Sequence, residues 1–122
     1  MREIKFRGLS INGEWYHGLL SISQGYNTQP PKGCYISNKA GQPWAYQVRP
    51  ETVGQYANLK DSNGKEIYEG DILKREAHSY LHVVKWMDNS SGFHLAWVFD
   101  SINAGMDIRI IGNIYENPEL LT

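Results

Sequence analysis

Short segments of alternating apolar and polar residues, separated by turn residues, recur along this chain. Residues 2–7 alternate, which predicts a strand with Ile4 facing a core and Arg7 facing water. The Asn12-Gly13 pair that follows favours a tight hairpin turn, and residues 14–22 are the expected return strand. The chain therefore opens with a predicted β-hairpin.

The middle of the chain is a polar stretch, residues 23–43, rich in Gly, Pro, Asn and Gln. It encloses a short apolar piece at residues 34–36, which predicts a long loop with a short strand inside it. Residues 44–49 alternate again and predict another strand, which Pro50 ends. Because proline favours the first position of a helix, a single helical turn is expected to start there.

The second half of the chain repeats this pattern of short strands and turns. Residues 61–64 read Asp-Ser-Asn-Gly, a strong turn because Asn63 and Gly64 tolerate positive φ. The remaining predicted elements are strands at 67–68, 71–74, 80–87, 93–99 and 107–115, a bend or bulge at Gly112, and a terminal helical turn at 117–121 with Asn117 as its N-cap.

These elements predict an all-β fold, with a small β-barrel-like architecture and short helical turns. From residue 69 onward the order of strand, hairpin, strand and turn favours an SH3-like barrel. We therefore predict an N-terminal β region over residues 1–68, containing the long loop at 23–43, and an SH3-like C-terminal β-barrel over residues 69–122. The two parts either fold separately or share one core.

Composition and charge narrow the classes of function. The 122 residues include 12 basic and 13 acidic side chains, and this balance lacks the basic excess of a nucleic-acid-binding protein, although a local basic face stays open. The single cysteine, Cys34, excludes an internal disulfide and any site that needs a cysteine pair. Because apolar runs are short and the N-terminus is charged, we expect a cytoplasmic protein with no membrane partner.

Asp61, Glu69 and Asp71 are the densest carboxylate group, and such a group could hold Mg²⁺ in a metal-dependent hydrolase. Turn capping and a solvated strand edge are the favoured alternative, because no third ligand is spaced to complete a site. His78 and His82 are four residues apart, but without a cysteine or acidic partner they are interpreted as surface residues. Nucleophile-elbow and phosphate-binding glycine motifs are missing from the sequence, so we predict no catalytic residue, metal site or cofactor.

Aromatic and basic residues provide another candidate surface, because small barrels bind single strands by stacking bases on aromatic rings. Trp86 is in phase with Val84, which favours core packing for most of these rings instead. The aromatic candidates are Trp15, Tyr16, Tyr56, Tyr68, Trp86 and Trp97. The candidate binding residues as a set are Lys5, Arg7, Tyr56, Tyr68, Lys74 and Arg75.

Three segments of the chain carry a family resemblance. These are VGQYANLKDSNGKEIYEGDIL at residues 53–73, the opening MREIKFRG and the ending IIGNIYENPELL. In this order they resemble the YopX family of small phage and prophage proteins, whereas residues 23–48 match no pattern. The resemblance implies a phage or prophage origin in bacteria, an all-β architecture with an SH3-like C-terminal half, and oligomers. It implies no catalytic residue.

The sequence thus leads to a principal prediction and two alternatives. The principal prediction is a non-enzymatic protein-binding or self-assembling module, which binds a host or phage protein or forms a homo-oligomer. The first alternative is a nucleic-acid-binding accessory in phage replication or regulation. An enzyme with a carboxylate site is the least favoured.

Overall fold

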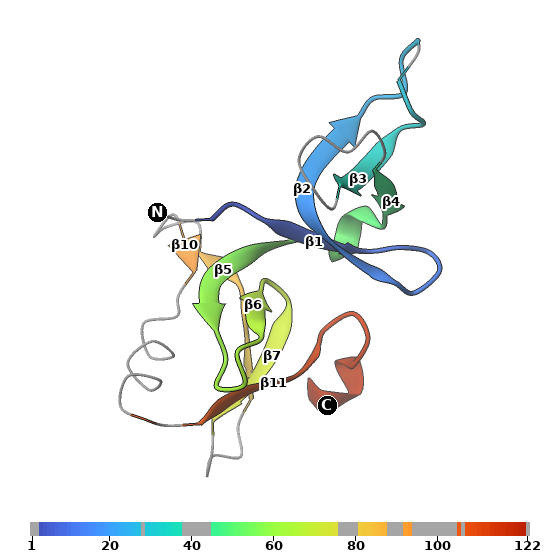
Figure 1. The fold of residues 1–122 in the computed structure, drawn as a ribbon. Coiled ribbons are helices and arrows are strands. Elements are labelled where there is room, and N and C mark those ends of the chain that lie inside the picture. Colours follow the sequence, from blue (N-terminus) through green and yellow to red (C-terminus); the bar gives the residue numbers. More distant parts are fainter. Residues whose placement is uncertain are drawn as a thin grey trace. The chain divides into compact units, whose positions relative to one another are not determined.

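The computed structural model describes residues 3–27, 29–37, 45–75, 81–87, 92–93, 105 and 107–121. They form two compact units, Met1–Tyr56 and Ala57–Thr122 (Figure 1). Regular structure in the described part consists of antiparallel strands and short 3₁₀ turns, which confirms the all-β prediction. Whether the predicted parts, residues 1–68 and 69–122, fold separately or share one core stays a prediction. The described part contains no helix that is long and apolar enough to cross a membrane.

The first unit is an antiparallel sheet with the strand order β4-β3-β2-β1-β5. The Ser10 hydroxyl accepts hydrogen bonds from the Asn12 and Glu14 backbone N–H groups at 3.2 and 3.3 Å, and Gly13 has a φ of 83°. The predicted opening hairpin is therefore confirmed. The strands are β1 (Phe6–Leu9), β2 (Trp15–Ser23), β3 (Gly33–Ser37), β4 (Tyr46–Val48) and the beginning of β5 (Gly54–Lys60).

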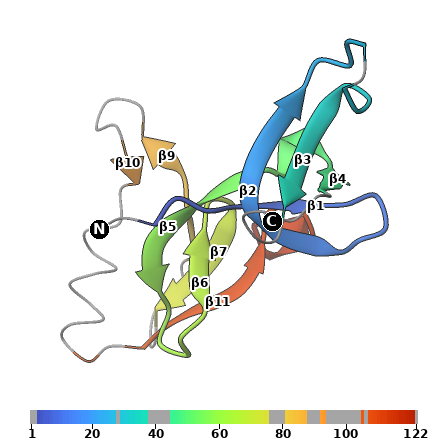
Figure 2. The same cartoon turned by 45° about the horizontal axis from the view of Figure 1, so that its top comes forward.

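Strand β3, predicted as a short piece within a long loop, is an internal strand of this sheet. Its Ile36 pairs with Leu20 of β2 on one side and with Tyr46 of β4 on the other. Both Tyr35 and Ile36 are buried. The short apolar piece of the polar stretch is therefore a core strand of the sheet (Figure 2).

The packing of β1 differs from the predicted pattern. Ile4 lies before the strand and is 66% exposed, whereas Arg7 is only 7% exposed. The predicted orientations of these two side chains are therefore wrong. The physical reason is that the Arg7 guanidinium lies over the Trp15 ring, 4.5 Å from its centroid, so a cation–π contact and the apolar stem make its burial favourable.

The corner after β4 is tied to the end of β1. The predicted helical turn is confirmed as a 3₁₀ turn, η1 (Pro50–Thr52). The Thr52 hydroxyl accepts a hydrogen bond from the Leu9 N–H at 2.9 Å and donates one to the Arg49 carbonyl at 2.7 Å. The Arg49 N–H in turn donates to the Leu9 carbonyl at 2.9 Å. Strands β1 and β4, which are not neighbours in the strand order, are thereby fixed close together at this end.

In the second unit, the end of β5 forms a hairpin with β6, and a separate sheet has the order β11-β7-β8. Within the described residues these sheets are open and do not close into a barrel. The core is a cluster of Ile67, Leu73, Val84 and Ile108. The elements are β6 (Glu66–Tyr68), β7 (Asp71–Arg75), β8 (Leu81–Val83), β9 (Trp86–Met87), β10 (Gly92–Phe93), β11 (Ile108–Asn113) and η3 (Pro118–Leu121).

Several predicted elements of this unit change in detail. The predicted strand at 80–87 is broken at Val84, whose N–H donates to the Asp71 carbonyl while its carbonyl accepts from the Gly70 N–H. Strand β9 pairs with β10, but the rest of the predicted strand at 93–99 lies outside the described residues. The predicted bulge at Gly112 is confirmed by a register shift between Ile110 and Gly112.

The C-terminal turn is held by two asparagines. Asn117 was predicted as the N-cap, but its side-chain oxygen accepts a hydrogen bond from the Asn113 N–H at 3.2 Å, and only its backbone carbonyl accepts from Leu120. The Asn113 side-chain oxygen accepts from the Tyr115 and Glu116 N–H groups at 3.0 and 2.9 Å. The side chain of Asn117 therefore stabilises the end of β11, where a donor needs an acceptor, instead of the helical turn.

Gly70, between β6 and β7, is expected to resist substitution more strongly than Gly64. Both have positive φ, 96° and 82°, which costs any residue with a Cβ about 1–2 kcal/mol. A Cβ at Gly70 would also lie 2.8 Å from Tyr115 Cε2, whereas one at Gly64 would meet nothing within 4 Å. Thermal unfolding should therefore show a larger loss of stability for Gly70→Ala than for Gly64→Ala. Equal losses would contradict the packing contribution at Gly70.

Candidate binding site

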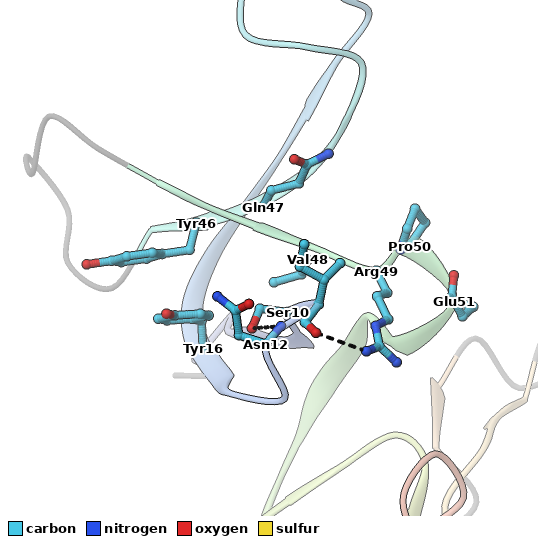
Figure 3. A pocket seen from close by; sticks show the side chains of 10 residues that line it. Ser10, Asn12, Tyr16, Tyr46, Gln47, Val48, Arg49, Pro50 and Glu51 are labelled. Atoms are coloured by element: carbon cyan, nitrogen blue, oxygen red, sulfur yellow. Dashed lines mark hydrogen bonds between the residues drawn. The ribbon is translucent and has the colours of Figure 1, made fainter.

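A pocket of about 430 Å³ lies in the first unit (Figure 3). The β1–β2 turn, β2, β4 and η1 contribute its walls. Its size falls within the range of about 300–1,000 Å³ that is usual for ligand sites. The lining residues are Ser10, Ile11, Asn12, Tyr16, Tyr46, Gln47, Val48, Arg49, Pro50 and Glu51.

Two stacked tyrosines form one wall of this pocket. The rings of Tyr16 and Tyr46 are parallel within 4°, and their centroids are 4.1 Å apart. The strand register places Tyr46 beside Ile36 and Leu20, four residues along β2 from Tyr16. Pairing alone does not bring the two rings together, so the sheet must also coil until β4 approaches β1, as the 2.9 Å hydrogen bond from the Arg49 N–H to the Leu9 carbonyl shows.

A carboxylate is hydrogen-bonded to one of the two stacked tyrosines. The Tyr16 hydroxyl donates a hydrogen bond to Glu14 Oε2 at 2.9 Å. This hydrogen bond, together with some burial and the negative charge of Glu14, raises the pKa of the Tyr16 phenol above its ordinary value of 10.0. Tyr16 therefore stays a neutral hydroxyl throughout the physiological pH range.

The base of the pocket is apolar and its rim is held by an arginine. Val48 is buried at 3% exposure, and Ser10 beside it is also buried. The Arg49 Nη2 donates a hydrogen bond to the Ile11 carbonyl at 3.4 Å, which fixes the β1–β2 turn at the rim. The side chain of Ile11 is 81% exposed there, so the rim offers an apolar surface to a ligand.

Several polar groups of the pocket have no hydrogen-bond partner within the described part of the chain. They are the side-chain amides of Asn12 and Gln47 and the hydroxyl of Tyr46. The ionic groups give the site a net negative charge, because the single cation Arg49 is opposed by Glu51 in the lining and by Glu14 beside the stack. The arrangement offers aromatic and apolar surface, amide hydrogen bonds and no excess of positive charge.

Most of the predicted binding residues lie elsewhere and have structural contacts. In the first unit, Lys5 Nζ lies 5.2 Å from the ring centroid of Tyr56, which is itself buried at 6% exposure. Arg7 covers Trp15, as described above. In the second unit, Tyr68 is 2% exposed and its hydroxyl donates to Glu66 at 2.9 Å. The rings of Tyr56 and Tyr68 are therefore covered and cannot stack on bases.

The remaining candidates lie in different environments. Lys74 is exposed and Arg75 is half-buried, both on β7. Of the other aromatic candidates, Tyr16 lies in the pocket, Trp15 is covered by Arg7, and Trp97 is outside the described residues. The structure does not describe the side chain of Trp86.

The carboxylates considered for metal binding accept backbone hydrogen bonds instead. Asp61 Oδ1 accepts from the Asn63 and Lys65 N–H groups, both at 2.9 Å, as expected for turn capping. Asp71 is 1% exposed, and its Oδ2 accepts from the Tyr68 N–H at 2.8 Å, so it does not lie on a solvated edge. Among the described residues no three His, Cys, Asp or Glu side chains are placed to hold a metal ion, and His78 and His94 lie outside them.

Comparison with known proteins identifies the family of the chain. The YopX protein family matches residues 5–122 of the chain. The chain belongs to the YopX family. Among solved structures, protein EF1440 from Enterococcus faecalis is similar over 100% of both chains, with 26% sequence identity and a TM-score of 0.58. No curated protein sequence matches this YopX-family chain.

Most residues of the pocket carry no signal of a site in the sequence. Tyr16 was named as an aromatic candidate, but Tyr46, Gln47 and Arg49 were assigned only to a strand. Asn12 was named only for its turn. The sequence Tyr-Gln-Val-Arg at 46–49 gives no signal for a binding site. Its tyrosine stacks on Tyr16, 30 positions away in the chain, and the coiling of the sheet that brings the two rings together cannot be read from a local pattern.

Proposed function

We propose that this YopX-family chain is a phage or prophage accessory protein that acts in the cytoplasm as a non-enzymatic protein-binding module. The pocket of the first unit is the proposed binding site. The observation that carries the proposal is the stacked pair Tyr16–Tyr46 beside unpartnered amides in a site without excess positive charge. The sequence resemblance supports the phage origin, and the whole-length family match supports the resemblance.

The chemistry of the pocket suits an extended segment of another protein. Aromatic faces pack against apolar or prolyl side chains and retain a polar edge that can accept or donate hydrogen bonds. The amides of Asn12 and Gln47 each carry a donor and an acceptor, as a peptide group does. A peptide can therefore bury an apolar side chain on the tyrosines while its backbone pairs with these amides.

The charge of the pocket disfavours the nucleic-acid alternative. A single strand that stacks on tyrosines brings phosphates with it, and phosphate binding needs an excess of Lys or Arg. Glu14 is bonded to the stacking residue Tyr16, and Glu51 lies in the lining with Arg49. Two carboxylates against one guanidinium would repel a phosphate backbone at this site.

An SH3-like C-terminal half would add a second adaptor surface by analogy with other small barrels. The open sheets of the second unit support only the coarser all-β fold. Residues 94–104, which include most of one predicted strand, lie outside the described part. The SH3-like topology therefore stays a prediction.

Selection from a random peptide library is the direct test of the proposal. Peptides enriched on the immobilised wild-type chain should bind at least tenfold more weakly to Tyr46→Ala, because the variant removes half of the stack (~1.4 kcal/mol or more). The matched control is Ile4→Ala, which removes an exposed apolar side chain outside the pocket and should leave binding unchanged.

Two results would contradict this function. One is that the selected peptides bind wild type and Tyr46→Ala equally, which would move the binding surface away from the pocket. The other is that no peptide is enriched while labelled single-stranded DNA binds in a salt-sensitive way. That second result would favour the nucleic-acid-binding alternative.

A further inference from the structure

We propose that the segment bound in this pocket is basic and belongs to another protein: an extended stretch in which an arginine or lysine stands next to a proline. The basic side chain pairs with Glu14, and the prolyl ring lies against the rings of Tyr16 and Tyr46. This inference rests on the proposed peptide-binding function and names the chemistry of its ligand.

The carboxylates of the site are not neutralised by the arginine beside them. Glu51 lies in the same lining as Arg49, but among the described residues its carboxylate forms no ion pair. The Arg49 Nη2 donates to the Ile11 carbonyl instead. Glu14 and Glu51 are both exposed. Two accessible carboxylates against one guanidinium give the site a net charge of −1, which a basic segment complements.

Glu14 is held in place with one carboxylate oxygen left over. Its backbone N–H donates to the Ser10 hydroxyl at 3.3 Å, and its carbonyl accepts from the Ser10 N–H at 2.9 Å. Its Oε2 accepts from the Tyr16 hydroxyl at 2.9 Å, whereas Oε1 has no partner in the described part of the chain. Because an ionised carboxylate accepts hydrogen bonds on both oxygens, Oε1 can bind a guanidinium or ammonium group.

The tyrosine wall favours a cation at the same place. A cation bound to Glu14 lies close to the stacked rings, because the Glu14 carboxylate is bonded to the hydroxyl of one of them. Aromatic rings attract cations through their π faces, and the planar guanidinium also stacks on them. Arginine should therefore bind at least as well as lysine, and an acidic residue should be repelled.

A proline next to the cation suits the remaining groups of the pocket. The Asn12 and Gln47 amides and the Tyr46 hydroxyl can donate to peptide carbonyls. A prolyl residue supplies a carbonyl but no N–H, so its ring can be buried on the tyrosines without leaving a donor unpaired. Adjacent residues have Cα atoms about 3.8 Å apart, so one short segment can reach both Glu14 and the rings.

The shape of the lining favours a segment of several residues over a single small cation. Figure 3 shows the tyrosine pair at one end of the lining, and Pro50 and Glu51 at the other. A peptide that places its basic residue at the tyrosine end can therefore continue along the pocket toward η1. Proline-containing segments are already extended before binding, which lowers the entropic cost of this arrangement.

The peptide library supplies the first part of the test. Peptides that bind the wild-type chain and lose binding in Tyr46→Ala should carry arginine or lysine next to proline well above the frequency in the unselected library. Selected peptides that are neutral or acidic would overturn the inference. In that case their dependence on Tyr46 would leave the proposed peptide-binding function standing.

A double-mutant cycle then tests the pairing with Glu14. Replacing the basic residue of a selected peptide with glutamine should weaken binding to the wild-type chain about fivefold. Glu14→Gln should weaken the original peptide by a similar factor, because it retains an oxygen for the Tyr16 hydroxyl and removes the charge. The same variant should bind the glutamine peptide as tightly as the wild type does.

Glu119→Gln is the matched control, since it removes the same charge from an exposed residue of η3 and should leave the binding of both peptides unchanged. Circular dichroism confirms that each variant is folded, and the peptide substitutions need no protein variant. If Glu14→Gln weakens both peptides equally or neither of them, the cation does not bind at Glu14 and the inference is wrong. If no peptide depends on Tyr46, the proposed function is wrong as well.

Discussion

Replacing Asp61 with alanine is expected to lower the free energy of unfolding of the second unit by about 3 kcal/mol. The carboxylate is 5% exposed and accepts three backbone hydrogen bonds. Two come from within the turn, from Asn63 and Lys65, and the third comes from Ile110 of β11 at 3.1 Å. The variant leaves these N–H groups without their charged acceptor in a poorly hydrated place. Urea unfolding followed by circular dichroism measures the loss.

Asp61→Asn is the matched control for this prediction. An asparagine can keep the Oδ1 acceptor for the turn, but its NH₂ group would then face the Ile110 N–H, donor against donor. We therefore expect an intermediate loss, smaller than that of the alanine variant. A loss below about 1 kcal/mol for Asp61→Ala would show that water replaces the carboxylate and that the turn does not depend on it.

Replacing Gly8 with alanine is expected to destabilise the first unit by about 1–3 kcal/mol through overpacking. A Cβ at this position would lie 2.6 Å from Val48 Cγ2 and 2.7 Å from Val48 Cβ. Val48 is buried and cannot move aside without shifting β4. Thermal unfolding of the full chain measures the change.

The double variant Gly8→Ala with Val48→Ala tests the cause. Removing the valine methyl groups relieves the contacts with Cγ1 and Cγ2 but keeps the one with Cβ, so the double variant should be less destabilised than the sum of the two single variants without regaining wild-type stability. Additive losses would mean that the contact with Val48 does not limit the substitution. The distance between residues 8 and 48 in the sequence makes this coupling a specific test of the β1–β4 approach.

Gly8 also has a consequence for the binding site. It pairs with Tyr16 in the β1–β2 register and lies against Val48, which forms the base of the pocket. A side chain here would separate β4 from β1 and so move Tyr46 away from Tyr16. Stability and peptide binding should therefore decrease together in Gly8→Ala, whereas Asp61→Ala acts in the second unit and should affect stability alone.

Much of the strand pattern was predictable because local signals agreed with it. The Asn12-Gly13 hairpin, the turn at 61–64, the 3₁₀ turn after Arg49 and the bulge near Gly112 all follow from residues with restricted or permissive backbones. Predictions that depended on contacts between residues distant in the sequence were less accurate. Arg7 was expected to face water because its neighbours in the sequence do not show that Trp15 lies beside it. In the structure its guanidinium makes a cation–π contact with the Trp15 ring, which favours its burial.

The candidate site was predictable only in part, for a related reason. Tyr16 was one of six aromatic residues named as able to stack on bases, most of which were expected to pack in the core, and Tyr56 and Tyr68 are indeed buried. An aromatic residue in a strand has the same sequence signal whether its ring packs in a core or lines a pocket. Pairing Tyr16 with Tyr46 required the coiling of the whole sheet.

The amino-acid sequence by itself determined the all-β class, the turns and the family, because these depend on backbone preferences and on residues close together in the chain. Only the tertiary structure decided which side chains meet. Val48 can approach β1 because Gly8 has no side chain, and this approach brings Tyr46 onto Tyr16 and forms the pocket. Contacts between residues some 30 to 40 positions apart depend on strand order and sheet coiling, which no local pattern specifies.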